Sequence, residues 1–322
     1  MTICFLGAGF PYVCGLPLAK DLFDSRTRLY SKKQYHKFKL VWDAYDNWRK
    51  CNSHKHVEEF LYELYSSIFI HYAKYEYAVE VIAAVLATPV GREYEYYSPR
   101  YKYRITSPLN CSLHTYFWQN LLNHFDDISI ITTNYDLTIE KCLRHTKMKR
   151  VFSTGFTYGG FKVPQSLKGV AQPFTIKDQQ KEIILKDGLN IYKLHGSLNW
   201  SREINNSISM FIDMRPAYRN NCDAAIVPPL PEKMVPNWLI NVWKEAENQL
   251  IHSEDWIICG YSFPDYDIAI NEMFRRTAKS KNIFVLDPNS KSIVEKLKNM
   301  IPNNSIYAFN GLPEGIEELI NC

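Results

Sequence analysis

The chain has 322 residues, 46% of them hydrophobic, and a formal net charge of +4. This length can bury a core large enough for one α/β domain with an inserted subdomain, and so small a net charge is not typical of a nucleic-acid-binding tail. No apolar run approaches the roughly 18 residues that span a bilayer, and the eight cysteines contain no CxxC pair, so we expect a cytoplasmic protein with reduced thiols and no zinc ribbon.

The chain begins with a predicted buried strand over residues 1–6, which leads directly into Gly7-Ala8-Gly9. A strand that delivers a glycine turn to a helix presents backbone N–H groups to which a pyrophosphate can bind, so nucleotide binding is the first hypothesis. Residues 16–30 are predicted to form the helix that packs back on the sheet. The dehydrogenase fingerprint also needs an acidic residue after a second strand, whereas Asp21 and Asp24 fall within the predicted helix, which disfavours hydride transfer.

A mainly helical insertion is predicted over residues 33–125, within a single domain that spans 1–322. Apolar residues recur at helical spacing along 57–64, and a further helix is expected over 110–124. The Tyr/Arg-rich segment 91–104 has residue types that contact single-stranded nucleic acid, but an edge hairpin or a partner-facing surface is the better interpretation. We therefore expect no direct nucleic-acid binding.

The second half of the chain alternates short apolar runs with helical patterns, which is typical of a parallel sheet. Residues 201–235 are instead expected to be rich in loops, with several prolines. Strands are predicted over 128–132, 183–185, 191–194, 256–259 and 283–286, and helices over 238–251 and 266–279. The predicted fold class is α/β, a Rossmann-like doubly wound and mainly parallel sheet with an inserted helical subdomain.

Polar or glycine-containing segments follow five of the predicted strands. They are Gly7-Ala8-Gly9, Thr133-Asn134-Tyr135-Asp136, His195-Gly196, Gly260-Tyr261-Ser262 and Asp287-Pro288-Asn289. Ligands of open parallel sheets bind outside the carboxyl ends of the strands, so these segments are expected to converge. Each also has a plainer interpretation, since glycines permit tight packing, Asn134 and Asp136 can cap the following helix, and His195 can be an ordinary core histidine.

Two other kinds of site are disfavoured by the residues present. The segment Gly260-Tyr261-Ser262-Phe263-Pro264 lacks the second glycine of a GxSxG nucleophile elbow, so a serine hydrolase is a poor interpretation. Cys51, His54 and His56 supply at most half of a metal site, and no second cluster completes it. We expect no bound metal.

Taken in order, the five segments and Gly15-Leu16-Pro17 resemble the nucleotide-site motifs of the sirtuin superfamily, and most closely those of sirtuin-like domains of bacterial antiphage defence proteins. The resemblance implies that NAD is the substrate. It places the pyrophosphate at Gly7, Ala8 and Gly9, the nicotinamide side at Asn134 and Asp136, the ribose at His195, and the adenosine half at Ser262 and Asn289. Phe10, Thr133, Gly260 and Asp287 complete the predicted NAD-binding set, and the ring of Phe10 either packs over NAD or seals the sheet.

The chain departs from protein-deacylating sirtuins in two places. Leu198-Asn199-Trp200 stands where a four-cysteine zinc module usually begins, and Leu18-Ala19-Lys20 stands where those enzymes carry Asp-Phe-Arg. The leading hypothesis is therefore hydrolysis of NAD to nicotinamide and ADP-ribose, with His195 as general base, Asn134 orienting the water or the ribose, and Asp136 positioning them.

Two alternatives stay open, NAD-dependent protein deacylation and a non-catalytic sensor of NAD or ADP-ribose. The resemblance also implies a role as effector of an antiphage, abortive-infection system. We expect a homo-oligomer that works with a HerA-type ATPase or an Argonaute-like protein and has no contact with a membrane.

Overall fold

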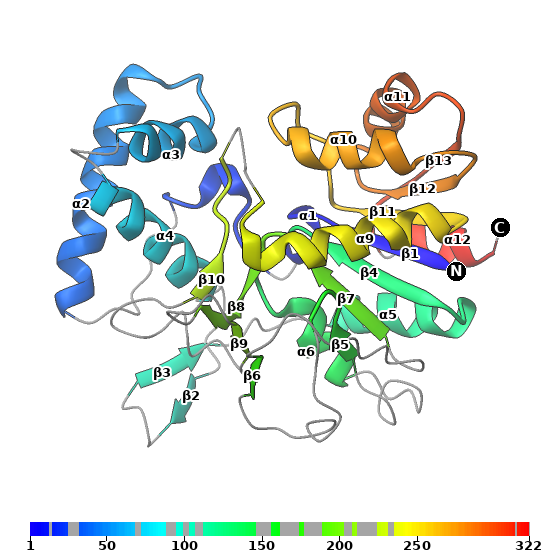
Figure 1. Ribbon diagram of the computed structural model, residues 1–322, viewed down its shortest axis with the longest axis horizontal. Helices are drawn as coiled ribbons and strands as arrows, with labels where there is room; N and C mark the ends of the chain where they lie inside the picture. The colour runs from blue at the N-terminus through cyan, green and yellow to red at the C-terminus, as the bar shows by residue number, and fades with distance from the viewer. Residues whose placement is uncertain are drawn as a thin grey trace.

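The computed structural model describes residues 1–12, 15–24, 32–67, 72–87, 95–98, 103–106, 112–145, 156–161, 174–176, 189–202, 208–210, 224–230, 235–312 and 314–321. At its centre is a seven-stranded parallel sheet in the order β13-β12-β11-β1-β4-β7-β5 (Figure 1). The strands are β1 (Thr2–Leu6), β4 (Ile128–Thr132), β5 (Phe156–Tyr158), β7 (Leu189–Lys193), β11 (Asp255–Cys259), β12 (Asn282–Leu286) and β13 (Ser305–Phe309).

The middle of the sheet is buried on both faces. Every residue of β1 and of β4 is buried, as expected for apolar, partly β-branched runs inside a parallel sheet. From β1 the chain adds β4 and β7 on one side, and it later returns to place β11 against the other side of β1. The direction of winding therefore reverses between β1 and β11, and ligands bind at such a switch point in open α/β sheets.

Helices cover both faces of this sheet, which confirms the predicted Rossmann-like, doubly wound α/β fold. On one face lie α9 (Ile240–His252), α10 (Ile268–Thr277) and α11 (Ser290–Met300), and on the other α5 (Ser112–His124), α6 (Thr138–His145) and α12 (Glu314–Ile320) (Figure 1). The predicted strand over 128–132 agrees with β4, and those over 256–259 and 283–286 lie within β11 and β12.

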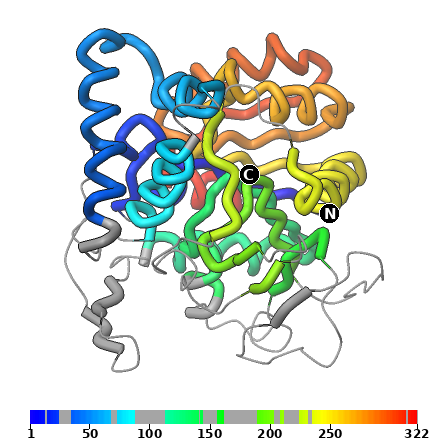
Figure 2. The backbone as a smooth tube through the Cα atoms, turned by 60° about the vertical axis from the view of Figure 1, so that its left-hand side comes forward, coloured from blue at the N-terminus to red at the C-terminus, as the bar shows by residue number. Residues whose placement is uncertain are grey.

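Three helices form a separate group beside the sheet, α2 (Lys32–Cys51), α3 (Val57–Ser66) and α4 (Tyr72–Ala87), with α2 on the outer side (Figure 2). They form most of a second hydrophobic cluster, which includes Phe38, Tyr45, Phe60, Leu61 and Ile82. By contrast, α5 packs in the main core through Phe117, Trp118 and Leu121. The predicted insertion over 33–125 thus contains helices in two packing environments, and its boundaries stay a prediction.

A second, four-stranded sheet was not predicted. Its strands β6 (Phe174–Ile176), β8 (Gly196–Arg202), β9 (Ile208–Met210) and β10 (Ala224–Ile226) pair antiparallel in the order β10-β8-β9-β6. Much of it falls in the stretch 201–235 that the sequence assigns to loops, because three of its strands have only three residues. The separate hairpin β2 (Glu95–Ser98) and β3 (Tyr103–Thr106) matches the expected edge hairpin.

The helix predicted over 16–30 is wrong for the residues described. The glycine turn is followed by one helical turn, α1 (Gly9–Tyr12), and later by a single 3-10 turn, η1 (Ala19–Asp21). Phe23 packs against Tyr45 and Phe60 of the helical group rather than on the sheet, so the apolar residues of this segment are buried without a helix. Residues 25–30, and the strand predicted over 183–185, lie outside the described residues.

The remaining connection before α9 is the 3-10 turn η3 (Asn237–Leu239). The helix predicted over 238–251 corresponds to η3 and α9 together, and the one over 266–279 corresponds to α10. Among the helices described, none combines the length and the apolar character that a bilayer crossing requires.

Candidate nucleotide site

A cavity of about 670 Å³ lies where β1, β4, β7, β11 and β12 end. This volume falls within the range of about 300–1,000 Å³ that is usual for small-molecule and cofactor sites. All five polar or glycine-containing segments reach its wall. The predicted residues that line it are Ala8, Gly9, Thr133, Asn134, Asp136, His195, Gly260, Ser262, Asp287 and Asn289.

The loops after β1 and β11 touch through their backbones. The Gly7 N–H donates to the carbonyl of Cys259 at 3.0 Å, and the Gly9 N–H donates to the carbonyl of Gly260 at 2.8 Å. Gly260 has φ +67°, and a Cβ added to Gly9 would lie 2.8 Å from the Gly260 Cα atom. Only glycine permits this approach, which leaves bare backbone on the cavity wall at the switch point.

Gly7 and Phe10, although predicted to bind NAD, do not line the cavity. Gly7 lies behind the wall, and its carbonyl accepts a hydrogen bond from Asn134. The Phe10 ring is 1% exposed and packs on His114 and Phe117, with centroids 4.2 and 5.3 Å away. Of the two positions considered for Phe10, the structure shows the one that seals the sheet, because α5 offers this ring an aromatic pocket.

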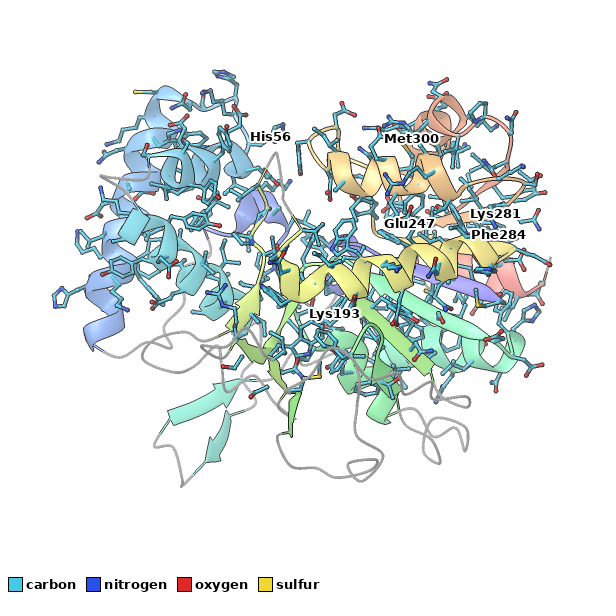
Figure 3. All side chains as sticks on the ribbon, viewed as in Figure 1. His56, Lys193, Glu247, Lys281, Phe284 and Met300 are labelled. Carbon is cyan, nitrogen blue, oxygen red and sulfur yellow. The ribbon has the colours of Figure 1, made fainter. Side chains whose placement is uncertain are left out.

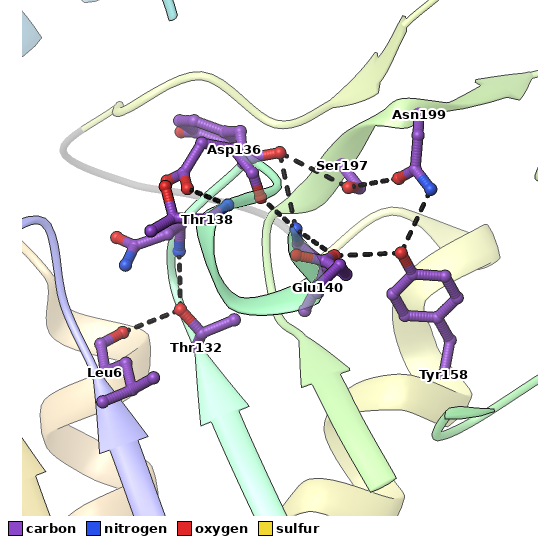
Figure 4. Close-up of polar contacts among 11 residues, drawn as sticks. Leu6, Thr132, Asp136, Thr138, Glu140, Tyr158, Ser197 and Asn199 are labelled. Carbon is purple, nitrogen blue, oxygen red and sulfur yellow. Dashed lines mark hydrogen bonds and ion pairs between the residues drawn. The ribbon is translucent and has the colours of Figure 1, made fainter. Parts of the chain in front are cut away.

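The Asn134 side chain joins two loops of the site. Its Nδ2 donates to the Gly7 carbonyl at 2.8 Å. Its backbone N–H donates to Thr132 Oγ1, which in turn donates to the Leu6 carbonyl, as Figure 4 shows for Thr132 and Leu6. Since a carbonyl can only accept, the amide nitrogen must face Gly7 and Oδ1 must point elsewhere. No described residue donates a hydrogen bond to Oδ1, so this oxygen can serve a ligand in the cavity.

Asp136 combines a capping role with a place on the cavity wall. Its Oδ1 accepts the Thr138 N–H at 2.8 Å at the beginning of α6 (Figure 4). This is the plainer function considered for Asp136, a side chain that satisfies a free helix N–H group. The carboxylate is nevertheless on the lining of the cavity, so capping and ligand contact are compatible.

His195 is held at the end of β7 by partners that the sequence did not reveal. The Val227 N–H donates to the His195 carbonyl, and Trp243 Nε1 donates to the Leu194 carbonyl, both at 2.8 Å. His195 is 4% exposed, and its ring centroid lies 6.2 Å from those of both Tyr135 and Trp243. The second sheet and α9 therefore fix the position of this ring on the cavity wall.

The helical group supplies a further part of the wall, which sequence analysis did not find. His56 and the buried Glu58, at the beginning of α3, line the cavity beside Tyr266, and Figure 3 shows His56 at the end of α3 that faces α10. Burial, followed by the charge and hydrogen bond of Glu58, raises the pKa of Tyr266. No signal near Glu58 links it to the nucleotide motifs, because tertiary packing alone brings α3 to this place.

Acidic side chains outnumber basic ones on the wall described. The acidic lining residues are Glu58, Asp136, Asp267 and Asp287, and the lysines are Lys20 and Lys296. Tyr261 donates to Asp267 Oδ2 at 2.7 Å, and burial, then the Asp267 charge, raises the pKa of that phenol. Within the ranges described, no group of three or more His, Cys, Asp or Glu side chains is arranged to hold a metal ion.

Together, the doubly wound sheet and the glycine-walled cavity at its switch point define a Rossmann-like nucleotide-binding protein. A family model for the SIR2-like domain matches residues 128–307, more than half of the chain, and the chain belongs to that family. The match contains Asn134, Asp136, His195 and Ser262, and it indicates an NAD-related activity in which NAD is substrate or ligand. No curated protein matches the chain.

Proposed function

We propose that this protein hydrolyses NAD to nicotinamide and ADP-ribose. The observation that carries the proposal is that Asn134 and His195, which follow different strands, line the same cavity as the glycine contact between the β1 and β11 loops. An imidazole, an amide oxygen and glycine backbone thus share one cavity.

The cavity wall fits a dinucleotide at several points. A Cβ at Gly9 or Gly260 would collide with the backbone of the opposite loop, so the two loops meet in a contact that only glycine allows. Beside this contact, Ala8, Gly9 and Gly260 line the cavity and would hold the pyrophosphate. Ser262, Asp287 and Asn289, after β11 and β12, would hold the adenosine half. The nicotinamide half would then lie toward Asn134, Asp136 and His195.

Each polar group near the nicotinamide half has a role that its contacts allow. Cleavage of the bond between nicotinamide and ribose develops positive charge on the sugar, which nearby oxygen atoms stabilise. Asn134 would use Oδ1 to orient water or a ribose hydroxyl, since its Nδ2 is engaged by Gly7. His195 would accept the proton, and Asp136, anchored at Thr138, would position the reacting groups without attacking.

The test is nicotinamide release from NAD by the purified protein. His195→Ala and Asn134→Ala should each lower turnover roughly 100-fold or more, the usual contribution of a general base or a positioned polar group. Asn304→Ala is a matched control, because Asn304 also donates its amide to backbone carbonyls, at the opposite edge of the sheet. Full turnover in both site variants would contradict these roles.

The same assay separates the two alternatives. Release of O-acyl-ADP-ribose from an acylated peptide would identify a protein deacylase. Tight NAD binding without turnover, under every activating condition, would identify a sensor.

We further propose that the protein is a cytoplasmic antiphage effector that acts as a homo-oligomer, with its activity controlled by assembly or by a HerA-type ATPase or Argonaute-like partner. The support is the sirtuin-like motif set together with an activity that would harm the cell if it were uncontrolled. Nicotinamide release should rise when the partner is added, and an assembly that remains inactive with every partner would contradict this control.

A further inference from the structure

A fully buried ion pair lies directly beneath the loop that carries Asn134 and Asp136. Lys193 Nζ, at the end of β7, is 2.9 Å from Glu140 Oε1 of α6, and the two side chains are 0% and 1% exposed. A buried ammonium or carboxylate requires a partner because removal from water strongly disfavours the charged form. Neither residue lines the cavity, so neither is explained by ligand contact.

The Lys193 ammonium also binds the backbone of that loop. It donates to the Asp136 carbonyl at 2.5 Å, and its distance to the Tyr135 carbonyl is 3.5 Å. These oxygens and Glu140 Oε1 match the three donors of an ammonium group. Lys193, on the strand that leads to His195, therefore holds the backbone carbonyls of Tyr135 and Asp136.

A chain of hydrogen bonds extends from the ion pair into the second sheet (Figure 4). Tyr158 Oη donates to Glu140 Oε1 at 2.9 Å, and Asn199 Nδ2 donates to Tyr158 Oη at 3.0 Å. Ser197 Oγ lies 2.6 Å from Asn199 Oδ1 and 3.3 Å from the Tyr135 carbonyl. The network thus begins and ends on the same loop and crosses β5, α6, β7 and β8.

This arrangement is not what optimal stability would require. Buried ion pairs contribute to stability only if their remaining polar atoms are satisfied, and an apolar replacement is often neutral or stabilising. Glu140 Oε2 is buried and makes no hydrogen bond to any described residue. The geometry is better suited to fixing the loop in one position relative to His195.

We propose that Lys193 and Glu140 are positioning residues, which hold the loop that carries Asn134 and Asp136 in a fixed position relative to His195. The inference rests on the proposed function for its consequence in turnover, but the positioning itself can be measured without turnover. Loss of the pair should loosen the loop and leave the binding residues chemically intact.

The test variant is Lys193→Met combined with Glu140→Gln. It removes both charges together and so avoids an uncompensated buried ion, and the amide that replaces the Glu140 carboxylate retains an oxygen to accept from Tyr158. Lys281→Met is the matched control, because Lys281 is also a buried lysine that donates to two backbone carbonyls, those of Ile251 and Ser253. Figure 3 shows Lys281 far from Lys193, at the opposite side of the sheet.

Two measurements are made on each protein. In amide hydrogen exchange, the segment 133–138 of the double variant should exchange faster than in the parent and in Lys281→Met. In nicotinamide release, kcat should fall by up to roughly 100-fold while KM changes little, because misplacement of about 1 Å affects the reacting geometry more than ligand binding.

The outcomes separate this inference from the proposed function. Unchanged exchange over 133–138 overturns the inference, whether or not the parent hydrolyses NAD. Faster exchange with an unchanged kcat also overturns it, since the position of the loop relative to His195 would then have no effect on turnover. Faster exchange in a parent background that never releases nicotinamide supports positioning and contradicts the NAD hydrolase.

Discussion

At the scale of single residues, Gly260 sets how closely the loops after β1 and β11 approach. Its φ of +67° is in the left-handed region, and an added Cβ would lie 2.2 Å from the Phe10 nitrogen. Neither the conformation nor the space suits any other residue. The bare backbone of this contact is what the proposed pyrophosphate site depends on.

We therefore expect Gly260→Ala to abolish NAD binding and to lower the free energy of unfolding by about 1–3 kcal/mol from backbone strain alone. Gly160→Ala is the matched control, because Gly160 has φ +80° and its Cβ would lie 2.4 Å from Val242 Cα, away from the cavity. Urea unfolding and NAD titration check both variants. Normal NAD binding by Gly260→Ala would exclude a pyrophosphate site at this contact.

The raised pKa of the Tyr261 phenol predicts how the free energy of unfolding changes with pH in alkaline solution. Burial, and then the Asp267 charge, raises its pKa well above the ordinary value of 10. Above that value the unfolded chain loses the phenol proton while the folded protein keeps it. The contribution of this phenol to the free energy of unfolding is therefore fully present below pH 10, and it is lost as the pH rises toward the folded-state pKa.

Tyr261→Phe should remove one such ionisation. Above pH 10, its free energy of unfolding should fall less steeply than that of the parent, by about 1.4 kcal/mol per pH unit. At pH 8 it should be less stable, because Asp267 Oδ2 loses a hydrogen bond. Urea unfolding at several pH values measures both effects, and equal slopes would mean that this phenol ionises normally.

At the scale of elements, the sequence predicted β4, β11 and β12 well because continuous apolar, β-branched runs have few alternatives to a buried strand. The second sheet was missed because strands of three residues, such as β9 and β10, carry too little periodicity. The helix over 16–30 was wrong because Phe23 is buried against α2 and α3, a choice made by tertiary contacts.

The residues of the candidate site likewise divide into those that the sequence could predict and those that it could not. Asn134, Asp136, His195 and Ser262 could be found because each follows a predictable strand, and strand ends converge in any parallel sheet. Glu58 and Trp243 could not, since their places depend on how α3 and α9 pack.

The helix α9 gives a prediction at this scale. Trp243 Nε1 holds the Leu194 carbonyl, and its ring lies beside His195. Trp243→Phe keeps a ring but loses the donor, so turnover should fall by up to roughly 100-fold as His195 shifts. Trp256→Phe is the control, because this β11 residue also loses an indole hydrogen bond, to Ser253 at the end of α9 that is far from Trp243. Equal nicotinamide release by parent and Trp243→Phe would contradict a role for α9.

At the scale of the whole molecule, the cavity lies between two hydrophobic clusters. The main cluster runs through the seven-stranded sheet, and the other joins α2, α3 and α4 to Leu198 and Ile226 of the second sheet. The second sheet thus connects the helical group to the strand end that carries His195. The lining of the cavity includes residues of both clusters, such as Ile293 of the main cluster and Leu86 of the other.

A bound dinucleotide should consequently slow amide exchange both in the helical group and in the loops of the seven-stranded sheet. With ADP-ribose at about 100 times its Kd, the folded state gains about 2.7 kcal/mol, and the gain should appear in the segments that touch the ligand. We expect slower amide exchange over 56–60 at the beginning of α3 as well as over 260–267 before α10, both of which hold lining residues. The strand β13, whose residues do not line the cavity, serves as the internal control. Protection confined to 260–267 would mean that the helical group does not close on the ligand, and that the sheet alone forms the site.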